Sequence, residues 1–394
     1  MKKGVIIFIS LVLVIIVLWI ATSRAVLYKN MLNGDFFTFW LSGWMVWQGQ
    51  QPYDQSQWLA NNHFFGAEWI PNPTFVYPLP LAILFAPLGS LDLLQAAKIW
   101  VLLSSLMVLA SAVLLLSLWT SPTKWSFLLP TVVGFFTFRA VLIVLRTAQL
   151  GALWLLIISL VIWFWKRRCW WCGGLLLPFL MLKPSFGFLI FGLAAIWLLV
   201  DRRLGALFGM VISGLALLII GWLIDPAWIQ HYLSIGGEKL ARDFGYFPTL
   251  WGFLYMFFQQ NLMRTAQVGV AISILIVTML LVIFLHWKNR LDPEKVMSLI
   301  ILVSLLLTPY LWAYDHILLL LPIMISMGYL YIWRTPYLVV ASFPICMSVL
   351  SLLLLFLAMK VGNDAMSVCL PLAISILMAL MLSRPISSSK MEQF

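Results

Sequence analysis

The sequence of 394 residues predicts an all-α membrane protein, and two observations carry this prediction. Hydrophobic residues make up 63% of the chain and charged residues only 9%, whereas a soluble globular protein carries about 25% charged residues. Apolar runs of about 20 residues recur along the whole chain, each long enough to cross a hydrocarbon core as a helix. Backbone groups in lipid must be hydrogen-bonded internally, so we expect these runs to be helices rather than strands. Residues 1–394 are expected to form a single integral membrane domain.

Apolar runs bounded by charge, proline or glycine predict about twelve transmembrane helices. The first run follows Lys2 and Lys3 and is longer than the core of a usual signal peptide, so we expect it to remain as the first helix. The run at 170–182 is too short to cross without help from its neighbours. The expected spans are 5–22, 92–119, 125–141, 147–165, 170–182, 184–200, 204–224, 266–287, 295–308, 312–331, 336–358 and 365–382.

The segment 74–89 is apolar enough to span but contains three prolines. Counting it as a crossing would place the basic run 166–168 on the outer side of the membrane. A re-entrant or interfacial element keeps that run inside, and prolines suit irregular backbone that is buried in protein. We therefore predict a re-entrant or interfacial element here.

The distribution of charge predicts the orientation. With both termini in the cytoplasm, the inner loops collect most of the Lys and Arg residues and the outer segments most of the acids, as expected for a multi-pass protein of a bacterial inner membrane. The net charge of +11 then reflects topology and contact with anionic lipid rather than a nucleic-acid site. The inner basic residues are Lys2, Lys3, Lys124, Lys166, Arg167, Arg168, Arg202, Arg203, Lys288, Arg290, Lys295, Arg334, Arg384 and Lys390, and the outer acids include Asp35, Asp54, Glu68, Asp225, Glu238, Asp243 and Asp315.

Two outer segments, 23–91 and 225–265, are longer than ordinary connections. Long loops in compact proteins are usually functional or disordered. Both segments are rich in Trp, Tyr and Phe, which favours elements packed at the membrane interface over disorder.

Cys169 and Cys172 form a C-x-x-C, a spacing found in redox motifs and in halves of zinc sites. No second Cys/His pair with ligand spacing accompanies it in the sequence, and a hydrophobic helix is expected to begin here. We therefore expect both cysteines to be packing residues. We expect neither a metal site nor a cofactor.

Ionisable residues at membrane depth are costly and therefore mark candidate functional positions. Under the predicted orientation they gather on the outer side. A carboxylate there is a candidate general base, and Arg or Lys a candidate phosphate ligand, a combination that suits transfer of a group from a phosphate. The candidates are Asp35 in the first outer loop, Arg139, Arg146 and Gln149 near a turn, Lys183 between two apolar runs, and Tyr310, Tyr314, Asp315 and His316 at the outer start of a helix.

Structural roles are the alternatives for these side chains. Asp35 could cap an interfacial helix, and Lys183 could extend to the lipid head groups. Asp315 and His316 could satisfy each other, and Arg139 and Arg146 could anchor to lipid phosphate.

Several short motifs resemble glycosyltransferase family 87, a group with the GT-C fold whose known members include polyprenyl-phosphate-mannose-dependent α-mannosyltransferases. The resemblance covers roughly residues 30–325. It rests on 35–40 (DFFTFW), 49–54 (GQQPYD), 77–80 (YPLP), 85–88 (FAPL), 148–150 (AQL), 174–176 (GLL) leading to Lys183-Pro184, and 308–310 (TPY) through 321–322 (LP).

The resemblance implies a GT-C-like enzyme that transfers a hexose with inversion outside the cytoplasm. The donor would be a polyprenyl-phosphate sugar and the acceptor a glycolipid or glycan in the lipid bilayer. Asp35 matches the general base, and Lys183 and His316 are the nearest matches to the residues that hold the lipid phosphate. Arg146, Gln149, Tyr53, Tyr77 and Tyr314 are the other candidate substrate-binding residues. No metal is needed where basic side chains neutralise the leaving phosphate.

The sequence departs from the family pattern at two places. Ala148 stands where a glycine usually precedes the Gln, and Tyr314-Asp315-His316 stands where many members carry paired histidines. Asp315 is therefore a rival to Asp35 for the role of base.

Two other functions stay open. A transporter or flippase of lipid-linked sugars would typically show internal repeats and charges near the membrane midplane, whereas here no repeat is detected and the candidate charges gather at one face. A glycan polymerase or ligase with a diphosphate-linked donor is the other alternative.

Overall fold

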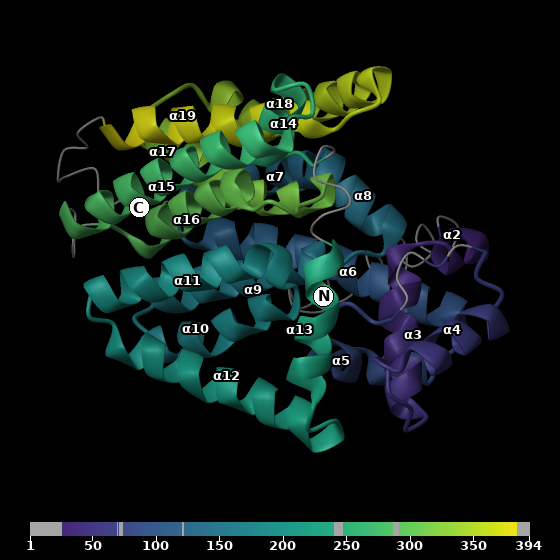
Figure 1. Ribbon diagram of the computed structural model, residues 1–394. Helices are drawn as coiled ribbons and strands as arrows, with labels where there is room; N and C mark the ends of the chain where they lie inside the picture. The colour runs from purple at the N-terminus through teal and green to yellow at the C-terminus, as the bar shows by residue number, and fades with distance from the viewer. Residues whose placement is uncertain are drawn as a thin grey trace, which may run out of the picture.

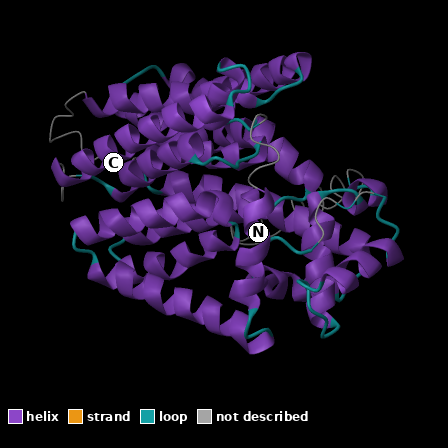
Figure 2. Cartoon of the chain, viewed as in Figure 1, coloured by secondary structure: helices purple, strands orange, loops and turns teal. Residues whose placement is uncertain are grey.

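The computed structural model describes residues 26–68, 70, 74–119, 122–239, 247–286 and 291–383, and every regular element within these ranges is a helix (Figures 1 and 2). The prediction of an all-α protein is confirmed. The first expected span, 5–22, lies outside the described residues.

The α-helices (α) and 3-10 helices (η) are α2 Tyr28–Leu32, α3 Asp35–Trp47, α4 Gln55–Phe64, α5 Leu79–Gly89, α6 Leu93–Ser117, η1 Pro122–Phe127, α7 Leu128–Thr137, α8 Arg139–Thr147, α9 Gly151–Lys166, α10 Trp170–Leu176, η2 Leu177–Leu182, α11 Pro184–Val200, α12 Leu204–Ile224, α13 Trp228–Lys239, α14 Leu250–Phe257, α15 Leu262–His286, α16 Pro293–Leu307, η3 Ala313–Leu319, α17 Leu320–Ile332, α18 Tyr337–Val361, η4 Ala365–Val368 and α19 Cys369–Ser383.

Among the residues that the structure describes, six helical segments are long and apolar enough to cross a membrane, namely α6, α12, α15, η3 with α17, α18, and η4 with α19. The helices around the bend at Phe138 make a seventh if they are counted as one broken span. The protein is therefore a multi-pass membrane protein. Each expected span from 92 to 382 contains a helix, but several are short, so the count of about twelve crossings stays a prediction.

The third expected span, 125–141, is interrupted. Helix α7 ends at Thr137, Phe138 is extended, and α8 starts at Arg139 at an angle of 61° to the preceding helical segment. Helix α7 packs tightly on α18, where a Cβ on Gly134 would lie 2.7 Å from the Pro344 side chain. The expected turn between the third and fourth spans is thus itself a helix of nine residues.

The basic loops and the candidate site residues lie at opposite ends of the bundle. At one end, Lys166 after α9 pairs with Glu294 at the start of α16 at 2.6 Å, and the hydroxyls of Thr123 and Tyr331 are 3.0 Å apart. The other ends of these helices lead to the contacts of the candidate site, which are described below. Which of these ends faces the cytoplasm stays a prediction.

The segment 26–91 forms four helices that gather at the right of Figure 1. Helices α3 and α5 approach closely because glycines lie at their crossing. A Cβ on Gly43 would lie 2.4 Å from the Phe85 carbonyl oxygen, and one on Gly89 would lie 2.3 Å from the Trp44 nitrogen. The proline-containing segment is therefore an ordered helix of 11 residues packed on α3. At about 1.5 Å per residue it is too short to cross the membrane alone.

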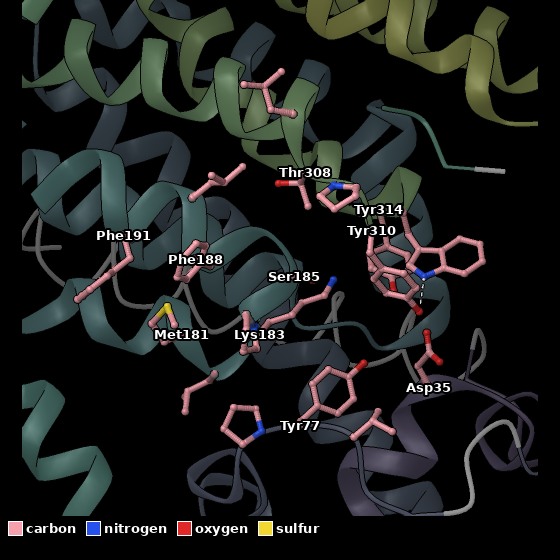
Figure 3. Close-up of a pocket in the computed structure, with 18 of the residues that line it drawn as sticks. Asp35, Tyr77, Met181, Lys183, Ser185, Phe188, Phe191, Thr308, Tyr310 and Tyr314 are labelled. Carbon is pink, nitrogen blue, oxygen red and sulfur yellow. Dashed lines mark hydrogen bonds between the residues drawn. The ribbon is translucent and has the colours of Figure 1, made fainter. Parts of the chain in front are cut away.

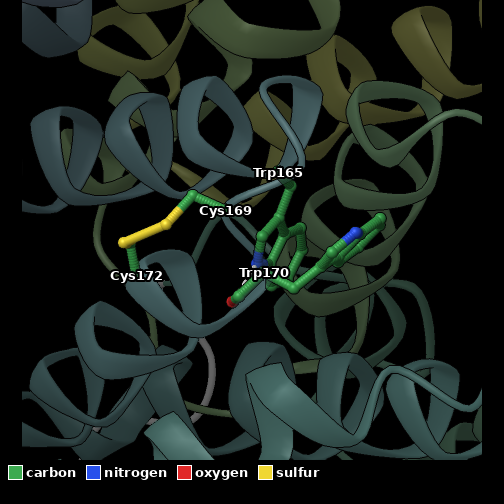
Figure 4. Close-up of a disulfide and its surroundings, with 4 residues drawn as sticks. All are labelled: Trp165, Cys169, Trp170 and Cys172. Atoms are coloured by element: carbon green, nitrogen blue, oxygen red, sulfur yellow. Dashed lines mark hydrogen bonds between the residues drawn. A yellow bond between two sulfur atoms is a disulfide. The ribbon is translucent and has the colours of Figure 1, made fainter.

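Cys169 and Cys172 are joined by a disulfide at the start of α10 (Figure 4). The sequence prediction of two packing cysteines did not include this bond. Their Cα atoms are 5.5 Å apart, a separation that a disulfide can bridge. Trp165 donates a hydrogen bond from its indole nitrogen to the Trp170 carbonyl at 3.1 Å, and the two rings stack beside the cysteines.

Candidate active site

A cavity of about 1670 Å³ opens at the end of the bundle that carries the candidate residues (Figure 3). One part of its lining carries charged and hydroxyl side chains, and another part is apolar. Figure 3 shows Met181, Phe188 and Phe191 on the far side of Lys183 from Asp35. The polar lining residues include Asp35, Tyr77, Arg139, Lys183, Tyr310, Tyr314 and Asp364, and the apolar ones include Met181, Phe188, Phe191, Leu217, Leu233, Val277, Leu355 and Met359.

Asp35 is the first residue of α3 and reaches the cavity from the first outer segment. Gly34, not Asp35, occupies the N-cap position, so capping does not account for this carboxylate. The Gln149 side-chain amide donates a hydrogen bond to Asp35 Oδ2, and the Gln149 carbonyl accepts one from the Trp100 indole at 3.3 Å. Gln149 therefore orients Asp35 towards the cavity.

The backbone at Ala148 sets the position of Gln149. Ala148 has φ +52° and ends α8 in the left-handed conformation, which glycine adopts at lower cost than alanine. The departure from the usual glycine thus keeps the same type of turn. The turn brings Gln149 against α3, although the two contacting residues are 114 positions apart.

Lys183 lies between η2 and α11 and is only 4% exposed. Its ammonium group forms an ion pair with Asp315, whose other oxygen accepts a hydrogen bond from the Trp312 backbone at 3.1 Å. The Lys183 Nζ also lies 4.4 Å from the centroid of the Tyr314 ring. Lys183 thus faces the cavity with Asp315 behind it and does not extend to the lipid surface.

His316 does not pair with Asp315. Its Nε2 lies 3.3 Å from the Pro248 carbonyl oxygen, and the side chain is buried outside the cavity lining. Asp315 is likewise outside the lining and only 1% exposed. Of the two rival carboxylates, Asp35 is therefore the one that borders the cavity.

Tyr77 and Tyr314 line the cavity, whereas Tyr53 and Arg146 do not. The Tyr53 hydroxyl donates to the Tyr77 carbonyl at 2.7 Å. Burial raises the pKa of Tyr53, so the hydroxyl keeps its proton and supports Tyr77. Arg146 is exposed on α8, while Arg139, at the other end of that helix, is buried and reaches the cavity.

Asp364 is a cavity residue that the sequence did not single out. It lies between α18 and η4 and pairs with Arg139 at 2.8 Å. No motif surrounds it, and its partner is 225 positions earlier in the chain. One sequence feature could have marked Asp364: it directly precedes the expected span 365–382, and a charge at the edge of a membrane span is costly unless it is paired.

Within the described part of the chain, no group of three or more His, Cys, Asp or Glu side chains is arranged to hold a metal ion. The cavity lining supplies two carboxylates, an ammonium group, a guanidinium group and hydroxyls around an apolar-walled space.

The helices and the cavity define a multi-pass helical membrane protein with one large cavity lined by charged, hydroxyl and apolar side chains. The model of glycosyltransferase family 87 matches residues 75–309, more than half of the chain, and the protein belongs to this family. The resemblance predicted from the motifs is thereby confirmed, and the protein is a membrane glycosyltransferase. No curated protein and no solved structure matches the chain. The matched region includes Tyr77, Arg139, Gln149 and Lys183, whereas Asp35 and Asp315 lie outside it.

Proposed function

We propose that the protein transfers a hexose, with mannose as the leading candidate, from a polyprenyl-phosphate donor to a glycolipid or glycan acceptor. The observation that carries this proposal is that Asp35, Lys183 and an apolar wall border the same cavity. A lipid-linked sugar phosphate needs these three surroundings, because it combines a reacting sugar, an anion and a hydrocarbon tail. The family membership supports the transferase class.

In the proposed reaction, Asp35 accepts the proton of an acceptor hydroxyl as its oxygen attacks the anomeric carbon. The bond from that carbon to the phosphate oxygen breaks, and its electron pair leaves with the phosphate. Attack opposite the leaving group inverts the configuration in a single step. Lys183 neutralises the charge that develops on the phosphate, as fixed charges do in other transferases. This chemistry needs no metal or organic cofactor.

Supporting residues hold these groups. Gln149 orients Asp35, and Asp315 positions Lys183. Tyr77 and Tyr314 border the space between them and are proposed to contact the sugar. His316 is buried behind the lining, so we assign it a positioning role rather than direct contact with phosphate.

We further propose that residues 1–394 form one membrane domain in a bacterial inner membrane, with both termini cytoplasmic and the cavity extracytoplasmic. Segments 23–91 and 225–265 are then the two outer loops. The shorter apolar helices, such as the 16-residue α9, are proposed to cross as well. Because 16 residues span about 24 Å and the hydrocarbon core is about 30 Å thick, these crossings require local thinning of the bilayer. Together with 5–22 they give the twelve spans.

The test uses purified protein in lipid nanodiscs with radiolabelled polyprenyl-phosphate sugars, their diphosphate-linked counterparts in parallel, and a total lipid extract of the source cells. A new labelled product is expected. Asp35→Asn should lower turnover by about 10²–10⁴-fold, the usual contribution of a general base, while donor binding persists. Asp54→Asn is the matched control, because Asp54 is a partly buried acid of the same outer segment that caps α4 and does not line the cavity.

Full turnover of purified Asp35→Asn would remove Asp35 from the chemistry. Absence of any product, combined with saturable donor binding and movement of the labelled lipid between leaflets, would assign the protein to the flippases. Product formed only from diphosphate-linked donors would assign it to the polymerases or ligases.

A further inference from the structure

Arg139 and Asp364 form a second charged pair in the cavity, separate from Asp35 and Lys183. The Arg139 Nη2 donates to both Asp364 carboxylate oxygens, at 2.8 and 2.9 Å, and Nη1 donates to the Ser367 hydroxyl at 2.7 Å. Both members of the pair line the cavity. The proposed reaction uses neither of them.

The surrounding backbone fixes this pair. Gly362, with φ +70°, ends α18 and turns the chain towards Asp364. The Ser367 hydroxyl donates to Asp364 Oδ1 at 2.6 Å. On the other side, the backbone N–H of Arg139 donates to the Ser351 hydroxyl of α18 at 3.1 Å. The pair is thus held between α8, α18 and η4 before any ligand arrives.

The two charged pairs of the cavity present opposite partners to a ligand. At Lys183, the cation lines the cavity and its carboxylate partner lies behind it. At Asp364, the carboxylate side chain is 23% exposed and the Arg139 side chain only 8%. The Asp364 carboxylate is partly exposed and its charge is balanced by Arg139, so it offers a phosphate no net positive charge, while its remaining lone pairs can accept hydrogen bonds from hydroxyl groups. The Asp364 end of the cavity therefore suits the hydroxyls of a neutral sugar.

The length of α8 separates this end from the reacting centre. Arg139 begins α8, and Gln149, which contacts Asp35, follows its end. The nine residues of the helix correspond to about 12 Å between the first and last at 1.5 Å per residue. Asp364 and Asp35 are thus contacted from opposite ends of α8, and we infer that a sugar at Asp364 is a different unit from the one whose hydroxyl faces Asp35.

We propose that Asp364, held by Arg139, binds a second sugar unit of the acceptor. The acceptor would therefore carry at least two sugar units, and its chain would lie along the α8 and α18 side of the cavity. The assignment to the acceptor rests on the proposed transferase function. Asp364 is in this view a specificity-determining residue that takes no part in proton transfer.

Direct binding tests this subsite without any donor. The probes are radiolabelled methyl glycosides of hexoses and of their disaccharides, added to the full-length protein in nanodiscs. We expect saturable binding of at least one disaccharide, tighter than that of the monosaccharides. Asp364→Asn should bind it about 10- to 100-fold more weakly, the factor for lost hydrogen bonds to a charged group. Asp201→Asn is the matched control, since Asp201 is a buried acid paired with Arg203 at the opposite end of the bundle.

Unchanged disaccharide binding by folded Asp364→Asn, or no disaccharide binding by the wild-type protein, would overturn the proposal. Because Asp364→Asn leaves the Arg139 charge without its partner, a double variant is measured as well. Arg139→Gln/Asp364→Asn removes both charges together and should fold while still binding weakly. Wild-type affinity in this double variant would equally overturn the proposal.

The transfer assay separates this inference from the proposed function. In Asp364→Asn, the amount of lipid extract that gives half-maximal product should rise about tenfold or more, while the half-saturating donor concentration stays unchanged. If wild-type protein forms no product, the proposed function fails, and the subsite proposal is then tested by the disaccharide binding measurement alone. If product forms and the acceptor dependence of Asp364→Asn is unchanged, only the subsite proposal fails.

Discussion

Asp35 and Asp315 are both carboxylates near the cavity, but their surroundings differ. Asp35 borders the cavity with one oxygen held by Gln149. Asp315 is buried behind Lys183, and both of its oxygens are engaged by Lys183 and the Trp312 backbone. A base needs a free lone pair within reach of the acceptor, so Asp35 suits that role and Asp315 suits the positioning of Lys183.

Replacing Asp315 tests this division of roles. Asp315→Asn should raise the half-saturating donor concentration by about tenfold, equal to about 1.4 kcal/mol, because Lys183 loses the partner that positions it. Turnover at saturating donor should largely survive. Leaving a buried charge without its partner should also destabilise the fold by about 3–5 kcal/mol. The measurements are donor-dependent transfer and thermal unfolding in detergent.

Glu294→Gln is the control for Asp315→Asn, because the buried Glu294 forms an ion pair with the partly exposed Lys166 at the other end of the bundle. It should lose stability without a change in donor dependence. Loss of turnover in Asp315→Asn at saturating donor, with donor binding intact, would instead make Asp315 the base.

The sequence identified Asp35 and Lys183 because each stands in a recognisable motif. It could not identify Asp364, because the role of that residue arises from packing against Arg139 across the bundle. The sequence also grouped Arg146 with the candidates. Arg139 and Arg146 lie at opposite ends of α8, and only Arg139 is buried. The orientation of α8 depends on the bend at Phe138, which a hydrophobic pattern does not encode.

Among the elements, η2 and α11 together set the position of Lys183, and a glycine controls how closely they pack. A Cβ at Gly187 would lie 2.0 Å from the Leu180 carbonyl oxygen, whereas a Cβ at Gly192 in the same helix would have no neighbour within 4 Å. The two glycines therefore offer a matched comparison within one helix.

Gly187→Ala should destabilise the protein by about 1–3 kcal/mol, the usual cost of overpacking, and should weaken donor binding by shifting Lys183. Gly192→Ala should be neutral or more stable by up to about 1 kcal/mol, because alanine favours helix. Unfolding by heat or denaturant in detergent measures both. Equal stability of the two variants would show that the contact between η2 and α11 is not tight.

The turn between α9 and α10 combines basic residues with the disulfide of Cys169 and Cys172. The proposed orientation puts this turn in the cytoplasm, where disulfides rarely persist. We therefore expect both sulfurs to be thiols in living cells and to form the disulfide after purification in air. Acid quenching followed by maleimide labelling and mass spectrometry distinguishes these states.

The labelling is done in a Cys346→Ser/Cys369→Ser background, because these two cysteines are exposed and free and would react as well. A fully formed disulfide in acid-quenched cells would place the turn in an oxidising compartment. That result would contradict the proposed orientation.

For the whole molecule, hydrophobicity and charge were enough to predict an all-α membrane protein with basic loops at one end. The described residues confirm the helical class. They do not establish the number of crossings, because only six helical segments, or seven with the bent one, are long enough by themselves. Short apolar helices and interfacial helices have similar composition, so sequence pattern alone does not separate them.

Reporter fusions test the orientation of the whole chain. Green fluorescent protein after residue 394 should fluoresce, and alkaline phosphatase after His63 should be active, since the first lies in the cytoplasm and the second outside it. Alkaline phosphatase after Asp201 is the control and should be inactive. The reverse pattern at all three positions would invert the proposed topology.

The ion pair of Lys183 and Asp315 also constrains how the protein is made. The two residues are 132 positions apart, so at about 5–20 residues per second the lysine is synthesised roughly 7 to 26 s before its partner. During that interval the ammonium group must remain in water, at the insertion machinery or beside lipid phosphate. The proposed donor-binding end of the molecule is therefore completed late in biosynthesis, and a nascent chain that stops before η3 carries Asp35 without the pair of Lys183 and Asp315.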